Sequence, residues 1–175
     1  MDLTERLISR ELIFKGRMID VERDVVMLPN GNNTTREVVR HPGAVAVVAI
    51  KDGKVILVRQ YRYPINSETL EIPAGKLESG EEPVICAQRE LREETGYRGS
   101  MTHLGTFYTT PGFTDEVMHL FLAKDLIWDP LAADDDEFLG VESIPWEEAV
   151  NLAKSGSFID AKTILGILIA HGRKV

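Results

Sequence analysis

The chain has 175 residues, of which 43% are hydrophobic, and this length suits one domain with a sizeable core and room for a small appendage. Its formal net charge of −8 argues against a surface that follows nucleic acid, and no apolar run approaches the roughly 18 residues of a membrane span. The N-terminus lacks a hydrophobic block and the chain has one cysteine, so we expect a cytoplasmic protein without nucleic-acid or membrane partners.

The first forty residues are predicted to form β structure. The runs IDVERDVVML and TTREVVR flank PNGNN, and the Asn30-Gly31 pair within it is a strong turn signal between two β-prone segments. This pattern predicts a hairpin. We place a boundary near His41, which divides the chain into an N-terminal β-rich region, residues 1–41, and a second region, residues 42–175.

The second region begins with two strands and ends with two helices. AVAVVAI and KVILVRQY are separated by KDG, and the first run is apolar throughout, as in a strand buried on both faces. TLEIPAG is predicted to be a short strand ending at Pro73, and HLGTFYTT and VMHLFLA add further strands. WEEAVNLAKSG and AKTILGILIAHG have helical spacing. The order β, α, β, α predicts an α/β sandwich with helices on both faces of a mixed sheet.

The run from Gly75 to Tyr97 gathers negative charge in a short segment. Its glutamates are Glu78, Glu81, Glu82, Glu90, Glu93 and Glu94. Pro83 suits a first helical turn and Gly96 suits the position after the last turn, so we expect a helix over about residues 83–94. A capping box made by Ser79 and Glu82 is an alternative start for it.

Three of these glutamates, Glu90, Glu93 and Glu94, lie on one stripe of the predicted helix. Like charges at this spacing destabilise a helix by roughly 0.2–0.5 kcal/mol per pair, and Arg89 offers only partial relief. Solvated surface charge is one interpretation. The loop PAGKLESGE favours another, because its glycines bend the chain back and let Glu78 join the carboxylates. Such hard oxygen ligands suit Mg²⁺ bridged to substrate phosphates, with Mn²⁺ as an alternative metal.

The same stretch resembles the Nudix box, Gly-x5-Glu-x7-Arg-Glu-U-x-Glu-Glu-x-Gly-U, where U is a bulky apolar or aromatic residue. The matching positions are Gly75, Glu81, Arg89, Glu90, Leu91, Glu93, Glu94, Gly96 and Tyr97. The resemblance implies a Nudix-type α/β/α sandwich with a mixed sheet, and a hydrolase that cleaves a nucleoside diphosphate linked to another group.

The resemblance also implies roles for individual residues. Mg²⁺ is expected to be held mainly by Glu90 and Glu94, helped by the backbone carbonyl of Ala74. Glu93 and Glu78 are expected as additional or water-mediated ligands. Arg89, the arginine of the box, is expected among the catalytic residues.

Segments outside the box are similar to bacterial ADP-ribose pyrophosphatases. In TTPGFTDE, Pro111 follows Gly96 by fifteen residues, a spacing that marks those enzymes, although Pro-Gly also occurs in ordinary turns. The resemblance implies hydrolysis of ADP-ribose to AMP and ribose 5-phosphate by a homodimer whose N-terminal hairpins cross to the second subunit. The matching substrate-binding positions are Arg36, Glu37, Arg59, Arg62, Pro111, Gly112 and Glu116.

Several of these roles have alternatives. Arg59 and Arg62 point to opposite faces of one strand, so only one faces a given ligand directly; we favour Arg62, and a surface salt bridge is the alternative for either. Glu37 is either exposed strand charge or a contact to an adenine amino group or a ribose hydroxyl. Glu137, at the end of the acidic run ADDDE, matches a glutamate that serves as the general base, or helps to position it, in the related enzymes, and Glu93 is the rival base.

Two other functions compete with ADP-ribose hydrolysis. One is hydrolysis of a broader set of nucleoside diphosphate sugars. The other is an ADP-ribose sensor that binds without cutting. The intact box favours an enzyme, because a sensor has no need of a metal-binding glutamate cluster.

Overall fold

The computed structural model describes residues 1–132 and 138–173. The chain forms two compact units, one made of residues 1–43 with 107–118 and the other of residues 44–106 with 119–175. The candidate base Glu137 and the preceding acidic residues 134–136 lie outside the described residues. None of the helices in the described part of the chain is both long and apolar enough to span a membrane.

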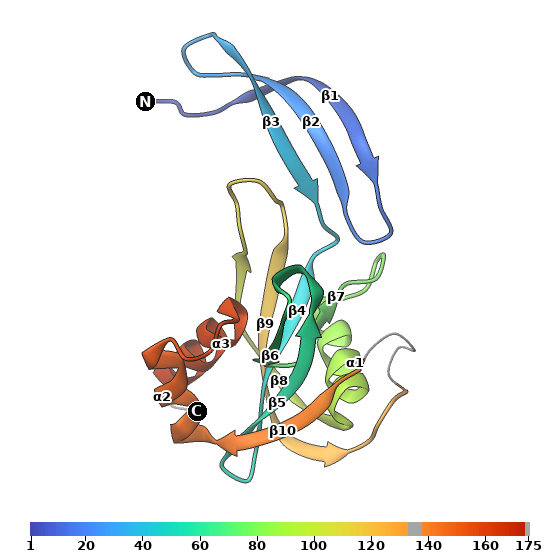
Figure 1. Cartoon of the computed structure of the whole chain (residues 1–175), viewed down its shortest axis with the longest axis vertical. Helices are drawn as coiled ribbons and strands as arrows, with labels where there is room; N and C mark the ends of the chain where they lie inside the picture. The colour runs from blue at the N-terminus through green and yellow to red at the C-terminus, as the bar shows by residue number, and fades with distance from the viewer. Residues whose placement is uncertain (133–137, 174–175) are drawn as a thin grey trace. The chain divides into compact units, whose positions relative to one another are not determined.

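The first unit is built on a three-stranded antiparallel sheet in the order β1-β2-β3 (Figure 1). Its strands are β1 (Arg6–Lys15), β2 (Asp20–Met27) and β3 (Asn33–Arg40). The predicted hairpin is confirmed, since Met27 pairs with Asn33 across the turn, in which Gly31 has a φ of 85°. Residues 107–118 join this unit because the Val39 amide donates to the Phe113 carbonyl at 2.8 Å.

The second unit is built on a seven-stranded sheet with the central order β10-β5-β4-β9-β8. These strands are β4 (Ala44–Lys51), β5 (Lys54–Arg62), β8 (Tyr97–Tyr108), β9 (Val117–Trp128) and β10 (Gly140–Pro145). Two short strands complete it: β6 (Ser67–Glu71) pairs with β5, and β7 (Ala74–Lys76) pairs with β4. A 3-10 turn, Tyr63–Ile65, connects β5 to β6.

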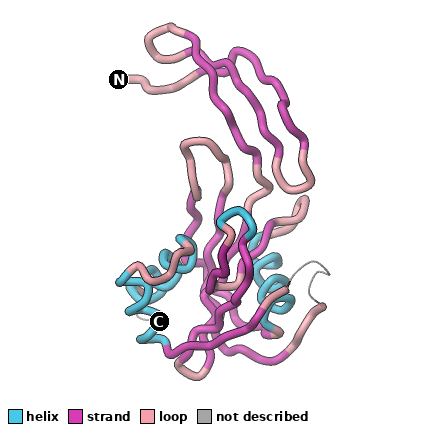
Figure 2. The backbone as a smooth tube through the Cα atoms, in the orientation of Figure 1, coloured by secondary structure: helices cyan, strands magenta, loops and turns pink. Residues whose placement is uncertain are grey.

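Helices cover both faces of this sheet, with α1 (Pro83–Thr95) on one side and α2 (Trp146–Ser155) and α3 (Ala161–Gly172) on the other (Figures 1 and 2). Val45 and Val47 of β4 share a hydrophobic cluster with Leu91 of α1. Val48, on the opposite face of β4, lies so close to Gly166 of α3 that an added Cβ there would be 3.0 Å from its Cγ2. The predicted α/β sandwich is therefore confirmed, and β4 is buried on both faces as its apolar run predicted.

Helix α1 begins at Pro83 and is capped by Gly96, as these two residues predicted. Pro83 is its first residue, and Gly96, with a φ of 77°, caps its C-terminus by donating its amide to the Arg92 carbonyl. The alternative start is wrong, because the N-cap is Glu82 and its side chain makes no capping bond. The six residues between β7 and α1 connect this strand of the sheet to the helix.

Candidate active site

Two buried glutamates of α1 face the short strand β7. Glu90 and Glu94 are 7% and 5% exposed, and the Ala74 amide donates to Glu94 Oε2 at 2.9 Å. A Cβ added to Gly75 would lie 1.9 Å from Glu90 Cδ, so only a glycine allows the backbone of β7 to approach this carboxylate so closely. The glycine that opens the box thus makes room for a glutamate fifteen residues later.

Arg89 joins three carboxylates of the box. Its Nε and Nη2 donate to Glu81 at 3.0 Å each, and its Nη1 donates to Glu90 at 2.7 Å and Glu93 at 2.9 Å. The hydrogen bond from Arg89 is the main cause that lowers the pKa of Glu81 to about 2, and these contacts raise the pKa of Arg89 above its usual value. The expectation that Arg89 offers partial relief is consistent with these contacts, because a single guanidinium offsets part of the charge of three glutamates.

The donor chemistry of this cluster fits a hard divalent cation. Glu90 and Glu94 are carboxylates one helical turn apart, and Mg²⁺ commonly takes only one or two protein carboxylates beside water and substrate phosphate. Among the described residues, no three His, Cys, Asp or Glu side chains are grouped closely enough to hold a metal by themselves. Glu78 is exposed, and in the hydrogen bonds that the structure shows it contributes its backbone to Glu81.

The two candidate arginines of β5 make different ion pairs. Arg62 donates from Nε and Nη2 to Glu71 at 2.8 and 2.7 Å, and Glu71 is 2% exposed. Arg59 donates to Glu142 at 2.5 Å and lies 3.8 Å from Glu68. The hydrogen bond to Glu71 is the main cause that raises the pKa of Arg62, and the charge of Glu94 adds to it. Arg62 therefore lies within electrostatic reach of Glu94 of α1, while Arg59 makes surface pairs.

The other predicted substrate-binding residues belong to the first unit. Arg36 pairs with Glu5, with N–O distances of 3.0 and 2.5 Å. Glu116 accepts a hydrogen bond from the Thr109 hydroxyl at 2.7 Å, and Pro111 and Gly112 lie in the turn before it. Glu37 lines a cavity of about 310 Å³, whose other walls are Ile13, Val21, Glu22, Arg23, Val38, Val39 and Phe113.

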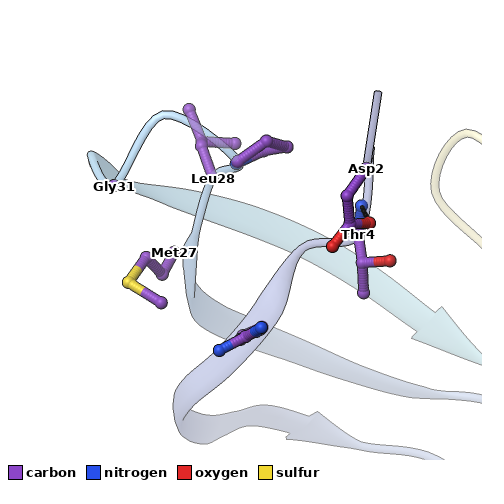
Figure 3. A pocket seen from close by; sticks show the side chains of 7 residues that line it. Asp2, Thr4, Met27, Leu28 and Gly31 are labelled. Atoms are coloured by element: carbon purple, nitrogen blue, oxygen red, sulfur yellow. Dashed lines mark hydrogen bonds between the residues drawn. The ribbon is translucent and has the colours of Figure 1, made fainter.

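A second cavity of about 230 Å³ also lies in the first unit, between the N-terminal residues and the β2–β3 turn (Figure 3). It is lined by Asp2, Thr4, Arg6, Met27, Leu28, Pro29 and Gly31. It contains none of the residues predicted for the site. The structure thus brings together Ala74, Arg89, Glu90, Glu93 and Glu94 in the second unit.

Sequence reasoning missed two charged residues beside Arg62. Glu71 accepts hydrogen bonds from Arg62, Thr69 and Lys162, and Lys162 comes from the first turn of α3. The available signal was a single acidic residue between Leu70 and Ile72 in the apolar run TLEIP, which is unusual in a buried strand. No local pattern pointed to Lys162.

Comparison with solved structures identifies the fold. The chain superimposes with a TM-score of 0.87 on a protein whose structure is titled "Crystal structure of ADP compounds hydrolase", covering 98% of this chain and 95% of that one at 24% sequence identity. This match supports the α/β sandwich with its additional N-terminal sheet.

Sequence comparison identifies the family. The chain is 48% identical to the ADP-ribose pyrophosphatase of Bacillus subtilis (strain 168), over 94% of this chain and 91% of that protein. It is 47% identical to the "Methanol dehydrogenase activator" of Bacillus methanolicus, over 93% of this chain and 90% of that protein. The model of the NUDIX domain matches residues 39–165, which include the complete box and the glutamate cluster of α1. The chain belongs to the NUDIX family.

Proposed function

We propose that the protein hydrolyses the diphosphate of ADP-ribose, releasing AMP and ribose 5-phosphate, in a reaction that requires Mg²⁺ or, alternatively, Mn²⁺. The observation that carries this proposal is the pair of buried carboxylates on α1, of which Glu90 lies beside the backbone of Gly75 and Glu94 accepts from the Ala74 amide. The choice of substrate rests on relatives named ADP-ribose pyrophosphatase at 48% and 38% identity, from Bacillus subtilis and Mycobacterium tuberculosis (strain ATCC 25618 / H37Rv).

Glu90 and Glu94 are the residues that would hold the metal, with the carbonyl of Ala74 as a further oxygen ligand. When bound, the ion supplies positive charge that makes a water molecule more acidic and neutralises phosphate oxygens. Arg89 keeps Glu90 and Glu93 in place through hydrogen bonds of 2.7 and 2.9 Å, so the carboxylates are ordered before substrate arrives.

The remaining steps are assigned to side chains of this chain. Arg62 binds oxygens of the diphosphate, because a guanidinium stays charged and donates along a planar fork. Glu137 accepts the proton of the attacking water, and Glu93 is the alternative acceptor.

The first unit is proposed to form a homodimer. Large apolar side chains of this unit are more than half exposed, namely Leu7, Ile8, Leu12, Ile13, Phe14 and Met18. Small sheets need a packed apolar face to be stable, and a second copy of the chain supplies one. The substrate-binding residues proposed for this unit are Arg36, Glu37, Pro111, Gly112 and Glu116.

The test is to incubate the protein with ADP-ribose and Mg²⁺ and to measure AMP by chromatography. Release of AMP that disappears on chelation of the metal supports the proposal, and the Glu94→Gln variant serves as the control.

A panel of other substrates, assayed in parallel, ranks them by kcat/KM. The panel contains ADP-glucose, NADH, diadenosine polyphosphates and oxidised dGTP. Binding of ADP-ribose by calorimetry without release of AMP would instead identify a sensor, and a higher kcat/KM for another sugar nucleotide would identify a broader hydrolase.

A further inference from the structure

Glu71 is a buried carboxylate whose four acceptor positions are all filled. Its Oε1 accepts from Arg62 Nε at 2.8 Å and from the Thr69 hydroxyl at 2.5 Å, and its Oε2 accepts from Arg62 Nη2 at 2.7 Å and from Lys162 Nζ. Burial opposes its ionisation, but the bonds from Arg62 and Lys162 outweigh burial and lower the pKa of Glu71 to about 2. The group is therefore an anion held by two cations.

The first turn of α3 holds this carboxylate in place. Lys162, whose side chain is 15% exposed, also pairs with Asp160 at 3.0 Å, and Asp160 caps α3 by accepting from the Thr163 amide at 2.9 Å. The Thr163 hydroxyl accepts from the Ile72 amide at 2.9 Å. Both the side chain of Glu71 and the backbone that follows it are thus hydrogen-bonded to the first turn of α3.

The bonds to Glu71 occupy one edge of the Arg62 guanidinium. They use Nε and Nη2, whereas Nη1 donates to no acceptor within residues 1–132 and 138–173. A guanidinium carries five N–H groups in a fixed plane, so the edge formed by Nη1 and Nη2 can still bind a second anion with two hydrogen bonds. The Arg62 side chain is 42% exposed, so it is not enclosed by the chain.

We infer that Glu71 and Lys162 are positioning residues, which hold Arg62 so that its second edge faces the diphosphate of the substrate. This inference rests on the proposed function, because it assigns the diphosphate to Arg62. Lys162 is essential to it, since without Lys162 the only cation left on a buried carboxylate is Arg62. Without Lys162, Glu71 loses the bond that ties its side chain to α3 and can shift, and the guanidinium bonded to it shifts with it away from the substrate.

A double-mutant cycle on kcat/KM for ADP-ribose tests whether Lys162 acts through Arg62. The four proteins are wild type, Lys162→Met, Arg62→Met and the double variant. We expect Lys162→Met to lower kcat/KM by about 10-fold in the wild-type background, as misplaced binding groups do. In the Arg62→Met background the same change has an effect of less than about twofold, because coupled residues are not additive. Lys162→Arg, which keeps the cation, restores most of the loss.

Lys54→Met is the matched control, because Lys54 is an exposed lysine at the other end of β5 from Arg62. It should leave kcat/KM unchanged. Circular dichroism checks that each variant is folded, and Thr69→Val, which removes another donor to Glu71, replaces Lys162→Met in the cycle if that variant does not fold.

Three outcomes overturn the inference. Equal losses from Lys162→Met in both backgrounds would mean that Lys162 does not act through Arg62. An Arg62→Met variant as active as wild type would remove the phosphate contact while leaving the hydrolase activity established. A wild-type protein that releases no AMP from ADP-ribose would remove the proposed function and this inference together.

Discussion

Glu94 combines burial with a hydrogen bond to the backbone of β7, so it gives the sharpest single-residue test of the proposed metal site. We expect Glu94→Gln to lose nearly all turnover at saturating Mg²⁺, because a neutral amide is a poor ligand for this ion. The fold should persist, since the glutamine oxygen still accepts from the Ala74 amide. Steady-state kinetics across a Mg²⁺ titration measures this, with the exposed N-cap variant Glu82→Gln as control. Near-normal kcat would contradict the assignment.

The general base is a choice between two glutamates. Glu93 already accepts a hydrogen bond from Arg89 at 2.9 Å, and Glu137 matches the glutamate of this loop in the related enzymes, so we favour Glu137. Glu137→Gln should lower kcat by about 10²- to 10⁴-fold while KM and the Mg²⁺ dependence change little. If Glu93→Gln carries the large loss instead, and Glu137→Gln stays within about threefold of wild type, Glu93 is the base.

Glu71 also predicts how stability depends on pH. Its pKa is lowered to about 2 in the folded protein from an ordinary value of 4.5, so between these values the unfolded chain binds more protons. The stabilisation from Glu71 is complete above pH 4.5 and is lost as pH falls toward 2. Between these two pH values, Glu71→Gln should reduce the slope of the unfolding free energy against pH by up to about 1.4 kcal/mol per pH unit. Denaturant unfolding at several pH values measures it, and an unchanged slope would contradict it.

At the scale of elements, the contact between β7 and α1 depends on one missing methyl group. A Cβ at Gly75 would overlap Glu90, so Gly75→Ala should displace this carboxylate. We expect the variant to need more Mg²⁺ for half-maximal activity and to have a kcat/KM lower by roughly 10- to 100-fold. Gly140→Ala is the control, because a Cβ there meets nothing nearer than 3.8 Å. Equal kinetics for the two alanine variants would show that Glu90 can move without consequence.

At the scale of the whole molecule, the exposed apolar side chains of β1 predict self-association. Leu12→Asp places a charge on an apolar contact and should shift the protein toward monomer and lower its activity. Ser9→Asp adds the same charge on the same strand at a position that is already polar. Light scattering after size-exclusion chromatography measures the mass of each variant.

Removal of residues 1–40 gives a second test of the dimer. We expect the truncated chain to lose activity on ADP-ribose, because it lacks Arg36 and Glu37 together with the apolar strands. A folded, truncated monomer with an unchanged KM would refute both the dimer requirement and the role of these residues.

The sequence by itself determined the elements whose signals are local. Asn30-Gly31 marked the β2–β3 turn, Pro83 and Gly96 bounded α1, and the unbroken apolar run of β4 indicated burial on both faces. These signals depend on backbone geometry and on the period of a single segment, so they can be found without knowing what the segment packs against. The box spacing likewise placed Glu90 and Glu94 on one side of α1.

Only the tertiary structure decided which side chains meet. Glu71 and Lys162 are 91 residues apart in the chain, yet they share a hydrogen bond because α3 covers the sheet beside β6. The guanidinium of Arg89 bonds to Glu81 as well as to glutamates of its own helix, and Glu90 of α1 lies against Gly75 of β7. No local period encodes such contacts, because they follow from the packing of helices on a sheet whose neighbouring strands are distant in sequence.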